Sequence, residues 1–352
     1  MTRHYDLIII GQGIAGTLLH HELSKRGKQI LVIDKGHKEA ASAVASGLIN
    51  PITGRKYVKS WMFDELDPQL RVTYQEIENV LSQNFINDHK IVRTLSSIKE
   101  ENLWHSKSAI PSYEKYFAPE VDDSEYRELI NGAVSFGEVA GGSKVDLRSL
   151  IKAYRELLIR NNQILEERFQ YDKLTHYDSQ KWEYRKGVTS DKIVFCEGWQ
   201  LRKNPFFAKL GQEAAKGEVL IVKLPNVKIT RSIKKKIFIT PLSGDLYWVG
   251  STYEWEFDDA SPSETKKQYL IEALNEMYQG EYKVIDHWAG VRPTTVDRRP
   301  LLGHHPEYKS MYLFNGLGTK GASLAPYWAK QMATFILDDT ILPTEVDLSR
   351  FC

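Results

Sequence analysis

The sequence predicts an α/β fold in which a parallel sheet, built from both ends of the chain, is interleaved with a mostly antiparallel α+β unit. Residues 5–10 have the pattern of a strand that is buried on both faces. A glycine-rich turn, a helix and a second strand follow it. Near the other end, a strand at 311–314 leads through glycines into a last helix. Between them, residues 217–255 hold several short strands close together, which is typical of an antiparallel sheet. A length of 352 residues leaves room for two domains.

The N-terminal segment has the pattern of one βαβ unit. Residues 5–10 form a continuous β-branched and apolar run, as expected of a strand that is buried on both faces. A glycine-rich turn over 11–16 follows, then a helical stretch over 17–26 and a second strand over 29–34. A helix of this length between two strands predicts that the strands pair in parallel.

The turn has the GxGxxG spacing of dinucleotide-binding folds. Gly11 permits the tight turn, Gly13 lets the backbone approach a pyrophosphate, and Gly16 allows close packing of the helix. The diphosphate would lie at the helix N-terminus. Asp34, at the end of the second strand, would accept hydrogen bonds from ribose hydroxyls and repel a 2′-phosphate, which disfavours NADP. Dinucleotide contacts are therefore expected from Gly11, Gly13, Ile14, Ala15, Gly16, Asp34 and Lys35.

The middle of the chain is less regular. Residues 51–142 show no readable fold apart from short helices, chiefly one over 70–83. The pattern then recovers, because Asp146 is a suitable N-cap and residues 147–160 repeat apolar positions at helical spacing. A strand is expected over 164–169.

A second formal GxGxxG lies between the strand at 311–314 and a helix over 324–337. The residues after it suffice for one helix and a tail, which is too little for a second βαβ unit and its domain. We expect this strand and helix to return to the N-terminal sheet and to present backbone amides and a helix N-terminus to a planar cofactor head. The amides and the helix N-terminus would stabilise negative charge there, and Lys320 would add its positive charge. The alternative is that Lys320 is an ordinary surface lysine. The predicted contacts are Gly316, Leu317, Gly318, Thr319, Lys320 and Gly321.

Composition and charge exclude several classes of function. The net charge of +1 creates no field that would draw the chain onto nucleic acid. Cys196 and Cys352 have no CxxC spacing, and the adjacent His304 and His305 would point opposite ways in a strand, so no metal site is expected. Apolar runs fall far short of the roughly 20 residues that span a bilayer, and no signal peptide precedes the first strand. These features predict a cytoplasmic protein without a transmembrane segment.

Four sets of motifs follow one another along the chain: Gly11 to Asp34, residues 191–199, residues 290–297 with 300–303, and residues 316–326. Their order resembles that of the FAD-dependent D-amino acid oxidase superfamily, which includes glycine oxidase and sarcosine oxidase. The resemblance spans nearly the whole chain. It implies a Rossmann-like FAD-binding domain assembled from residues 1–80, 143–212 and 286–352, and a substrate domain assembled from residues 81–142 and 213–285.

The resemblance also implies how FAD is held. Ser42, Ser46 and Gly47 would lie in the loop that passes the flavin, Phe169 in the strand that meets the adenine end, and Gly198, followed by Trp199, near the pyrophosphate. The family's usual ribose-binding residue is Glu, so Asp34 is one methylene shorter. Some relatives tether flavin through a cysteine after the GxRP segment, but residues 298–308 contain none. Noncovalent FAD is therefore expected.

Arg292 is the main candidate for substrate binding. A guanidinium holds a carboxylate in a bidentate pair, and in the family the matching arginine anchors the substrate carboxylate beside the flavin. The alternative is a structural ion pair with Asp286 or Asp297. The implied reaction is oxidation of a C–N bond of a small amino acid or N-substituted glycine by hydride transfer to flavin, with O2 or an unknown carrier as electron acceptor. Because the cofactor performs the chemistry, no protein acid or base is obligatory.

Specificity would come from the antiparallel sheet and nearby loops. Lys236 and Phe238 alternate onto one face of a strand expected over 236–240, at positions that resemble the pocket-lining sites of glycine oxidase. Their side chains differ from the polar and tyrosyl types expected there, which argues against glycine as the substrate. Tyr253 is a further pocket candidate, and Arg55 lies in a loop soon after the flavin-passing segment. The alternative for each is ordinary packing or surface exposure.

Two other functions stay open. The segment 316–321 also resembles the flavin domain of the bifunctional enzyme that builds methylaminomethyl groups on tRNA wobble uridine. Arg231 with the lysines at 234–236 forms the only dense basic run, and the near-zero net charge argues against nucleic acid. The other alternative is a non-catalytic dinucleotide-binding protein.

Overall fold

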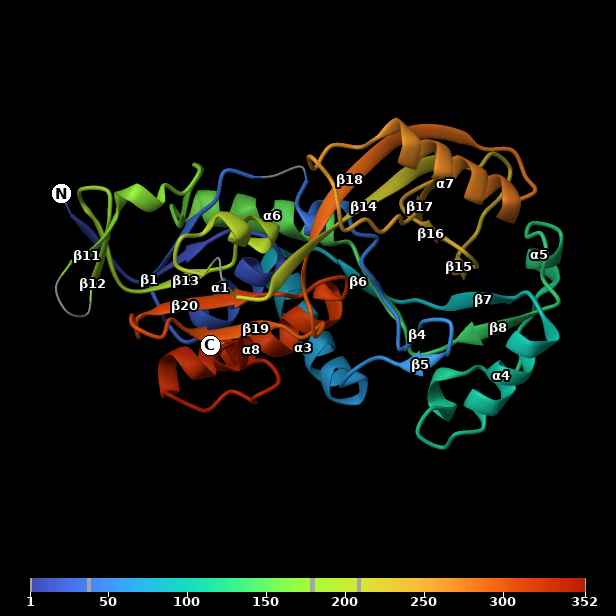
Figure 1. The fold of residues 1–352 in the computed structure, drawn as a ribbon, viewed down its shortest axis with the longest axis horizontal. Coiled ribbons are helices and arrows are strands. Elements are labelled where there is room, and N and C mark those ends of the chain that lie inside the picture. The colour runs from blue at the N-terminus through green and yellow to red at the C-terminus, as the bar shows by residue number, and fades with distance from the viewer. Residues whose placement is uncertain (1, 37–38, 178–180, 208–209, 352) are drawn as a thin grey trace.

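The molecule contains two large sheets, one in each half (Figure 1). The half that carries both chain ends holds an eight-stranded sheet, and the opposite half holds a seven-stranded sheet. Segments from distant parts of the chain contribute to both halves. The computed structural model describes residues 2–36, 39–177, 181–207 and 210–351.

The eight-stranded sheet joins the two ends of the chain. Its strands are β1 (Arg3–Ile10), β2 (Ile30–Ile33), β10 (Ile164–Leu165), β11 (Leu174–Tyr177), β12 (Lys181–Tyr184), β13 (Val188–Phe195), β19 (Leu301–His304) and β20 (Met311–Asn315). β10, β2, β1, β13 and β20 pair in parallel, whereas β12, β11 and β19 pair antiparallel to their neighbours. The prediction that the last strand returns to the N-terminal sheet is confirmed, because β20 pairs with β13.

Helices cover one face of this sheet. They are α1 (Ile14–Ser24), α3 (Phe63–Leu81), α6 (Leu147–Arg160) and α8 (Gly321–Asp338). Along β1, Leu7 and Ile9 pack into the core that these helices share, while Ile8 and Ile10 pack into a second core on the opposite face. Burial on both faces explains why this strand is continuously apolar. As predicted, the Asp146 side chain caps α6 by accepting a hydrogen bond from the Ser149 amide.

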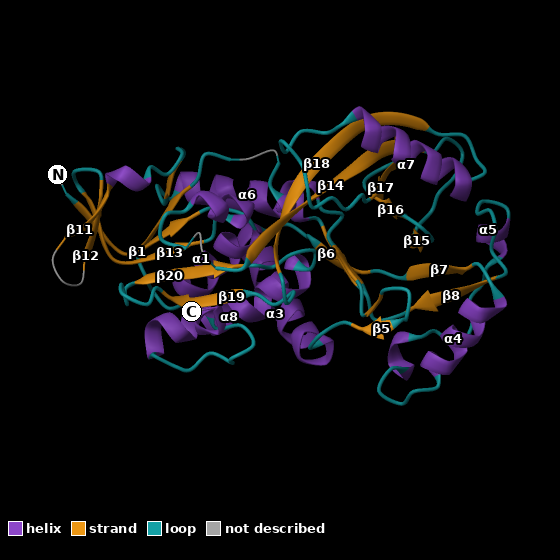
Figure 2. Ribbon diagram, viewed as in Figure 1, coloured by secondary structure: helices purple, strands orange, loops and turns teal. Residues whose placement is uncertain are grey.

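The seven-stranded sheet has the strand order β18, β14, β17, β16, β15, β7, β8. Its strands are β7 (Ile91–Leu95), β8 (Ser135–Val139), β14 (Gln212–Lys223), β15 (Ser232–Lys234), β16 (Phe238–Pro241), β17 (Leu246–Gly250) and β18 (Lys283–Thr295). Figure 2 shows α7 (Glu264–Met277) lying across one face of this sheet, where the two bury a core of their own. The domain boundary expected between residues 285 and 286 falls inside β18.

Smaller elements complete the chain. They are α2 (Ala41–Val44), α4 (Ile98–Ser108), α5 (Ser124–Arg127), a sheet of β3 (Leu48–Ile49), β9 (Ser143–Val145) and β6 (Ile86–Asp88), the pair β4 (Ile52–Thr53) and β5 (Val58–Lys59), and the 3-10 turns η1 (Glu114–Tyr116), η2 (Tyr171–Lys173), η3 (Gly198–Lys203) and η4 (Leu348–Phe351). Within the described ranges, no helix is both long enough and apolar enough to cross a membrane.

Three sequence-based expectations about secondary structure were wrong. The stretch 51–142 is not irregular, since it holds α3, α4 and two strands of the large sheet. The strand expected over 164–169 ends at Leu165, so Phe169 lies in the loop that follows. The strand expected over 236–240 begins at Phe238, because Lys235 donates its amide to the Ile237 carbonyl in a tight turn between β15 and β16.

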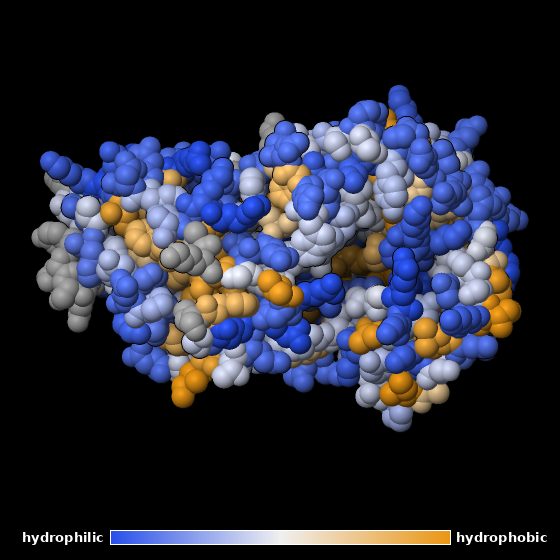
Figure 3. Space-filling model, viewed as in Figure 1, coloured by the Kyte–Doolittle hydropathy of each residue, from blue (hydrophilic) through white to orange (hydrophobic). Residues whose placement is uncertain are grey.

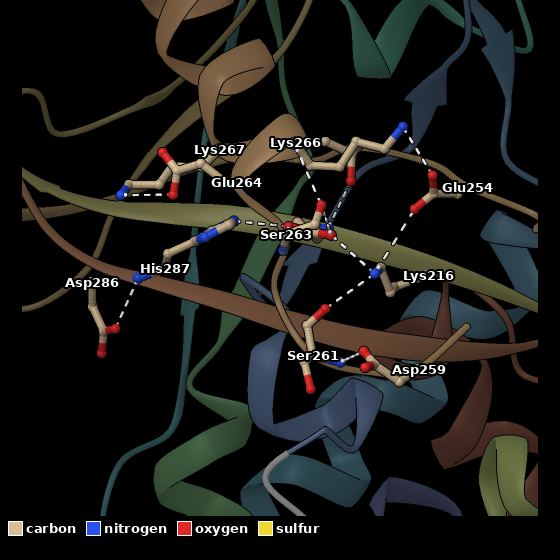
Figure 4. A network of polar contacts seen from close by, with 12 residues as sticks. Lys216, Glu254, Asp259, Ser261, Ser263, Glu264, Lys266, Lys267, Asp286 and His287 are labelled. Carbon is tan, nitrogen blue, oxygen red and sulfur yellow. Dashed lines mark hydrogen bonds and ion pairs between the residues drawn. The ribbon is translucent and has the colours of Figure 1, made fainter. Parts of the chain in front are cut away.

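A buried carboxylate joins α7 to the sheet (Figure 4). Glu218 on β14 is 0% exposed, and its oxygens accept hydrogen bonds from the amide and hydroxyl of Ser263, the N-cap of α7, at 2.8 and 2.9 Å. The Lys216 ammonium lies 3.2 Å from the same carboxylate and donates to the Ser261 carbonyl, while His287 Nε2 lies at 2.9 Å. These contacts fix the end of the loop over 251–263, which connects β17 to α7.

We expect Lys216→Met to destabilise the protein by about 3 kcal/mol, because removing one partner of a buried ion pair leaves the other charge without compensation. Urea unfolding of the apoprotein measures the change. The matched control is Lys267→Met, which removes the ammonium of an exposed pair with Glu264 at 3.3 Å and should change the free energy of unfolding by less than about 1 kcal/mol. Equal unfolding midpoints for the two variants would contradict the role assigned to Lys216.

Candidate active site

A cavity of about 580 Å³ lies where the carboxyl ends of the parallel strands meet the seven-stranded sheet. Figure 3 shows the surface hollowed between the two halves, with apolar side chains at the bottom of the hollow. Segments from the beginning, middle and end of the chain line the cavity. The predicted site residues in its lining are Gly11, Gly13, Ile14, Ala15, Asp34, Lys35, Ser42, Ser46, Gly47, Phe169, Gly198, Trp199, Arg292, Leu317, Gly318, Thr319 and Gly321.

Three predicted residues support the cavity from behind its lining. A Cβ at Gly16 would collide with the Gly11 carbonyl, so this glycine serves helix packing. Gly316 adopts a φ of +73° and packs against Leu301. Lys320 donates to the Ser60 hydroxyl at 3.2 Å, and burial, together with the nearby arginines at 298 and 299, lowers the pKa of its ammonium. Lys320 is therefore not an ordinary surface lysine.

The first glycine turn forms one wall of the cavity. Gly11 has a φ of +100°, and a side chain there would collide with the Cys196 carbonyl. The Ser42 hydroxyl accepts a hydrogen bond from the Ile14 amide at 3.1 Å in the first turn of α1. A Cβ added to Gly13 would meet nothing closer than that hydroxyl, at 3.6 Å. The open space above Gly13 and the amides of the helix N-terminus suit a diphosphate.

Asp34 has a partner that sequence analysis missed. Its carboxylate accepts hydrogen bonds from the Gln12 amide at 2.9 Å and from Arg155 Nη1 at 2.9 Å. Arg155 reaches it from α6, far away in the sequence, and also donates to the Asp34 carbonyl at 2.7 Å. The Gly36 amide also donates to Oδ1, at 2.5 Å, and these contacts fix the carboxylate in the lining of the cavity.

Glu197 is a second residue that sequence analysis missed, although it directly precedes Gly198. Its carboxyl group accepts hydrogen bonds from the Tyr171 hydroxyl at 2.5 Å and from Asn204 Nδ2 at 2.7 Å. Burial raises the pKa of this carboxyl group to about 7, and the two hydrogen bonds only partly oppose the rise. Glu197 is thus a titratable group in the cavity wall whose charge changes near neutral pH.

Arg292 projects from β18 into the cavity. Its Nη2 donates to the Ser251 hydroxyl at 2.7 Å and to the Thr252 carbonyl at 3.3 Å, and the Tyr253 ring lies 5.1 Å from its guanidinium carbon. Its Nη1 is buried and has no hydrogen-bond partner in the part of the chain that the structure describes. Burial lowers the pKa of this guanidinium, so an anion placed at Nη1 would be favoured.

The structural ion pair considered for Arg292 does not form. Asp297 pairs with Arg350 at 2.8 Å, and Asp286 accepts a hydrogen bond from the Trp288 ring nitrogen. The guanidinium lies over Gly217, where any side chain would occupy the same space. A glycine inside a strand was the sequence signal that could have predicted this close approach.

The three predicted specificity residues lie in different surroundings. Tyr253 is 47% exposed but contacts Arg292 through its ring. Phe238 is partly buried on β16, next to the cavity-lining Trp248. Lys236 does not share a strand face with Phe238: it lies in the turn before β16 and extends to Glu276 on α7, at 3.4 Å.

A model of the FAD dependent oxidoreductase family matches residues 6–334 of the chain. The chain belongs to this family. Glycine oxidase from Bacillus licheniformis is 25% identical over 97% of this chain and 95% of its own length. The crystal structure of glycine oxidase from Bacillus cereus superposes with a TM-score of 0.80 at 22% identity, covering 96% of each chain. The bifunctional tRNA-modifying protein MnmC from Vibrio cholerae is 25% identical, but this chain covers only 57% of it.

The residues present fit the family's cofactor. FAD needs a diphosphate cradle at a helix N-terminus, an acceptor for ribose hydroxyls and space for two ring systems. The turn at 11–16, Asp34 and the cavity between Phe169 and Arg292 supply them. The second glycine segment, at 317–319, lines the same cavity, so one cofactor site accounts for both GxGxxG matches.

We expect the affinity for FAD to fall as pH rises through about 7, because the protonated Glu197 is compatible with a nearby diphosphate and the carboxylate is not. The folded-state pKa is raised, so the protonated form that favours binding is lost with increasing pH. Fluorescence titration of apoprotein with FAD between pH 6 and 8 should show a dissociation constant that rises up to about tenfold. Glu197→Gln should abolish this dependence, and an identical pH profile in the variant would contradict the assignment.

The two glycines of the first turn should respond differently to alanine. Gly16→Ala should destabilise the apoprotein by about 1 to 3 kcal/mol, because the added Cβ would collide with the Gly11 carbonyl. Gly13→Ala should leave the unfolding midpoint unchanged and weaken FAD binding at least about tenfold, since its Cβ would fill only the space above the helix N-terminus. Denaturation and FAD titration of both variants provide the test, and unchanged FAD affinity in Gly13→Ala would place the diphosphate elsewhere.

Proposed function

We propose that this protein oxidises a C–N bond of a small amino acid or an N-substituted glycine, with noncovalently bound FAD as the oxidant. The observation that carries the proposal is the unpartnered Nη1 of Arg292 in the wall of the cavity that fits FAD. A buried guanidinium nitrogen without a partner is costly, and a substrate carboxylate would satisfy it. The relatives named glycine oxidase support a substrate of this class.

The residues around Arg292 would bind and orient the substrate. Ser251 and the Thr252 carbonyl hold Nη2, which leaves Nη1 free for a carboxylate oxygen. Val219 and Trp248 line the neighbouring wall and would exclude water from the reacting carbon. Bound FAD supplies the hydride acceptor, so the protein needs to position the amine and requires no nucleophile of its own.

The basic run at 231–236 gives little support to a function in tRNA modification. Arg231 pairs with Glu138 at 3.3 Å, Lys235 donates to the Asn131 carbonyl at 2.8 Å, and Lys236 extends to Glu276. These three side chains have separate partners, and Lys234 contacts the Lys236 carbonyl and the Phe238 ring, so the run does not form one free basic surface. A small carboxylated amine is therefore the favoured substrate class.

The test is anaerobic mixing of the FAD-containing protein with amino acids and N-methyl amino acids, followed by flavin absorbance. At least one amine should bleach the flavin. Arg292→Ala should lower kcat/KM about 10²- to 10³-fold through loss of a charge-assisted carboxylate contact, with FAD still bound. Arg292→Lys keeps the charge but loses the bidentate geometry, so its kcat/KM should fall between those of the unmodified protein and Arg292→Ala. Unchanged activity in Arg292→Ala would remove this residue from the site.

A further inference from the structure

One face of the seven-stranded sheet continues from the cavity to a group of cations. The residues Trp288, Val219, Gly250, Phe238, Lys234 and Arg93 are paired in register across six adjacent strands, so their side-chain positions lie on one face. Phe238 packs against the cluster of Val44, Val219 and Trp248, all of which line the cavity. The cationic end of this row therefore lies on the same sheet face as the cavity, separated from the lining residues by Phe238.

Two like charges stand side by side at that end. Lys234 on β15 is the register partner of Arg93 on β7, and like charges directly opposite each other destabilise a sheet. Burial, followed by the charges of Arg93 and Arg55, lowers the pKa of the Lys234 ammonium to about 8. The ammonium donates to the Lys236 carbonyl at 2.8 Å and lies 4.4 Å from the centre of the Phe238 ring. An anion would relieve this repulsion.

Arg93 is buried and incompletely paired. It is 9% exposed, and its Nε has no hydrogen-bond partner among the described residues. Nη2 reaches the Gly54 carbonyl at 3.4 Å, and the Tyr57 side chain interacts favourably with the guanidinium, its ring lying 5.2 Å from the guanidinium carbon. Both contacts come from the turn between β4 and β5, which also carries Arg55.

No carboxylate forms an ion pair with this group within the described part of the chain. Glu100 interacts with Arg93 electrostatically without a hydrogen bond between the two side chains. Its Oε2 accepts a hydrogen bond from the Ser96 amide at 2.8 Å. Neither Arg55, Arg93 nor Lys234 forms an ion pair with a described acidic residue. Three cations from three elements thus lie near one another without a directly paired carboxylate among the described residues.

We propose that Arg55, Arg93 and Lys234 form a second anion-binding subsite, and that the substrate is an amine with a second anionic group remote from the carboxylate held by Arg292. The proposal rests on the proposed function. The Arg292 guanidinium lies over Gly217 on β14 and the Lys234 ammonium lies against Phe238 on β16, with β17 between these strands. Phe238 is in register with Val219, two residues from Gly217, so two strand spacings and this offset correspond to about 12 Å, a span that suits a short dicarboxylate chain.

A binding experiment on the FAD-containing protein tests the subsite without turnover. Flavin absorbance changes are titrated with α,ω-dicarboxylates from succinate to suberate and with their monoamides, which keep the length and lose one charge. At least one dicarboxylate should bind tenfold more tightly than its monoamide. Lys234→Met should reduce this ratio below twofold, and Arg55→Gln, an exposed position that leaves the core intact, should reduce it in part. A ratio near one in the unmodified protein would overturn the proposal.

The neighbouring lysine provides a matched control. Lys235→Met removes an ammonium that donates to the Asn131 carbonyl, and it should keep the dicarboxylate preference. If Lys235→Met and Lys234→Met lower the ratio equally, general charge and not the subsite is responsible, and the proposal fails.

A kinetic arm separates this proposal from the proposed function. N-(carboxyalkyl)glycines are compared with their terminal amides for flavin reduction under anaerobic conditions. Loss of the acid preference in Lys234→Met with unchanged kcat for the amide supports the subsite. If dicarboxylates bind selectively and no amine reduces the flavin, the subsite stands and the proposed function fails. If amines reduce the flavin with no preference for a second charge, the proposed function stands and the subsite fails.

Discussion

The parallel pairing of β13 with both β1 and β20 is the constraint on which the site depends. These three strands come from the middle, the beginning and the end of the chain, and pairing brings their carboxyl ends to one edge of the sheet. Gly11, Gly198 and Leu317 follow these ends within three residues, and Asp34 directly follows the adjacent β2. Ligands of open parallel sheets bind at such an edge, so the ladder creates a cofactor site from segments that are distant in sequence.

The sequence predicts the fold and the cavity lining correctly where the signal lies within one segment of the chain. The spacing of the first glycines, the cap at Asp146 and the shortage of chain after Gly321 each follow from one segment and its physical chemistry. It does not predict contacts between segments that are distant in the sequence and meet only in the folded protein. Arg155 reaches Asp34 only because α6 packs against β10, which pairs with β2, and the raised pKa of Glu197 depends on its burial near residues distant in sequence. The helix α4 was missed because it buries only one residue, so it has little periodic pattern to detect.

The two faces of the seven-stranded sheet divide stability from recognition. On one face, α7 covers an apolar core, and the buried Glu218 fixes the start of that helix. On the other face lie Arg292, Trp248 and Phe238, with small residues such as Gly217 where a large side chain must pass. Because neighbouring residues of a strand point to opposite faces, Gly217 lies beside the guanidinium while Lys216 and Glu218 hold the helix. A one-residue register slip would exchange these roles.

The long ladder between β14 and β18 also limits how the two halves can move. It runs from Gln212 paired with Thr295 near the cofactor cavity to Lys223 paired with Lys283 at the far side of the sheet. A hinge between the halves would have to break or bend this ladder, whereas hinge motions use a few residues in loops or at element ends. The ladder therefore favours a fixed spacing between the halves, and the loop over 251–263, which carries Tyr253, is itself tied to β14 through the backbone of Thr252 and Glu254.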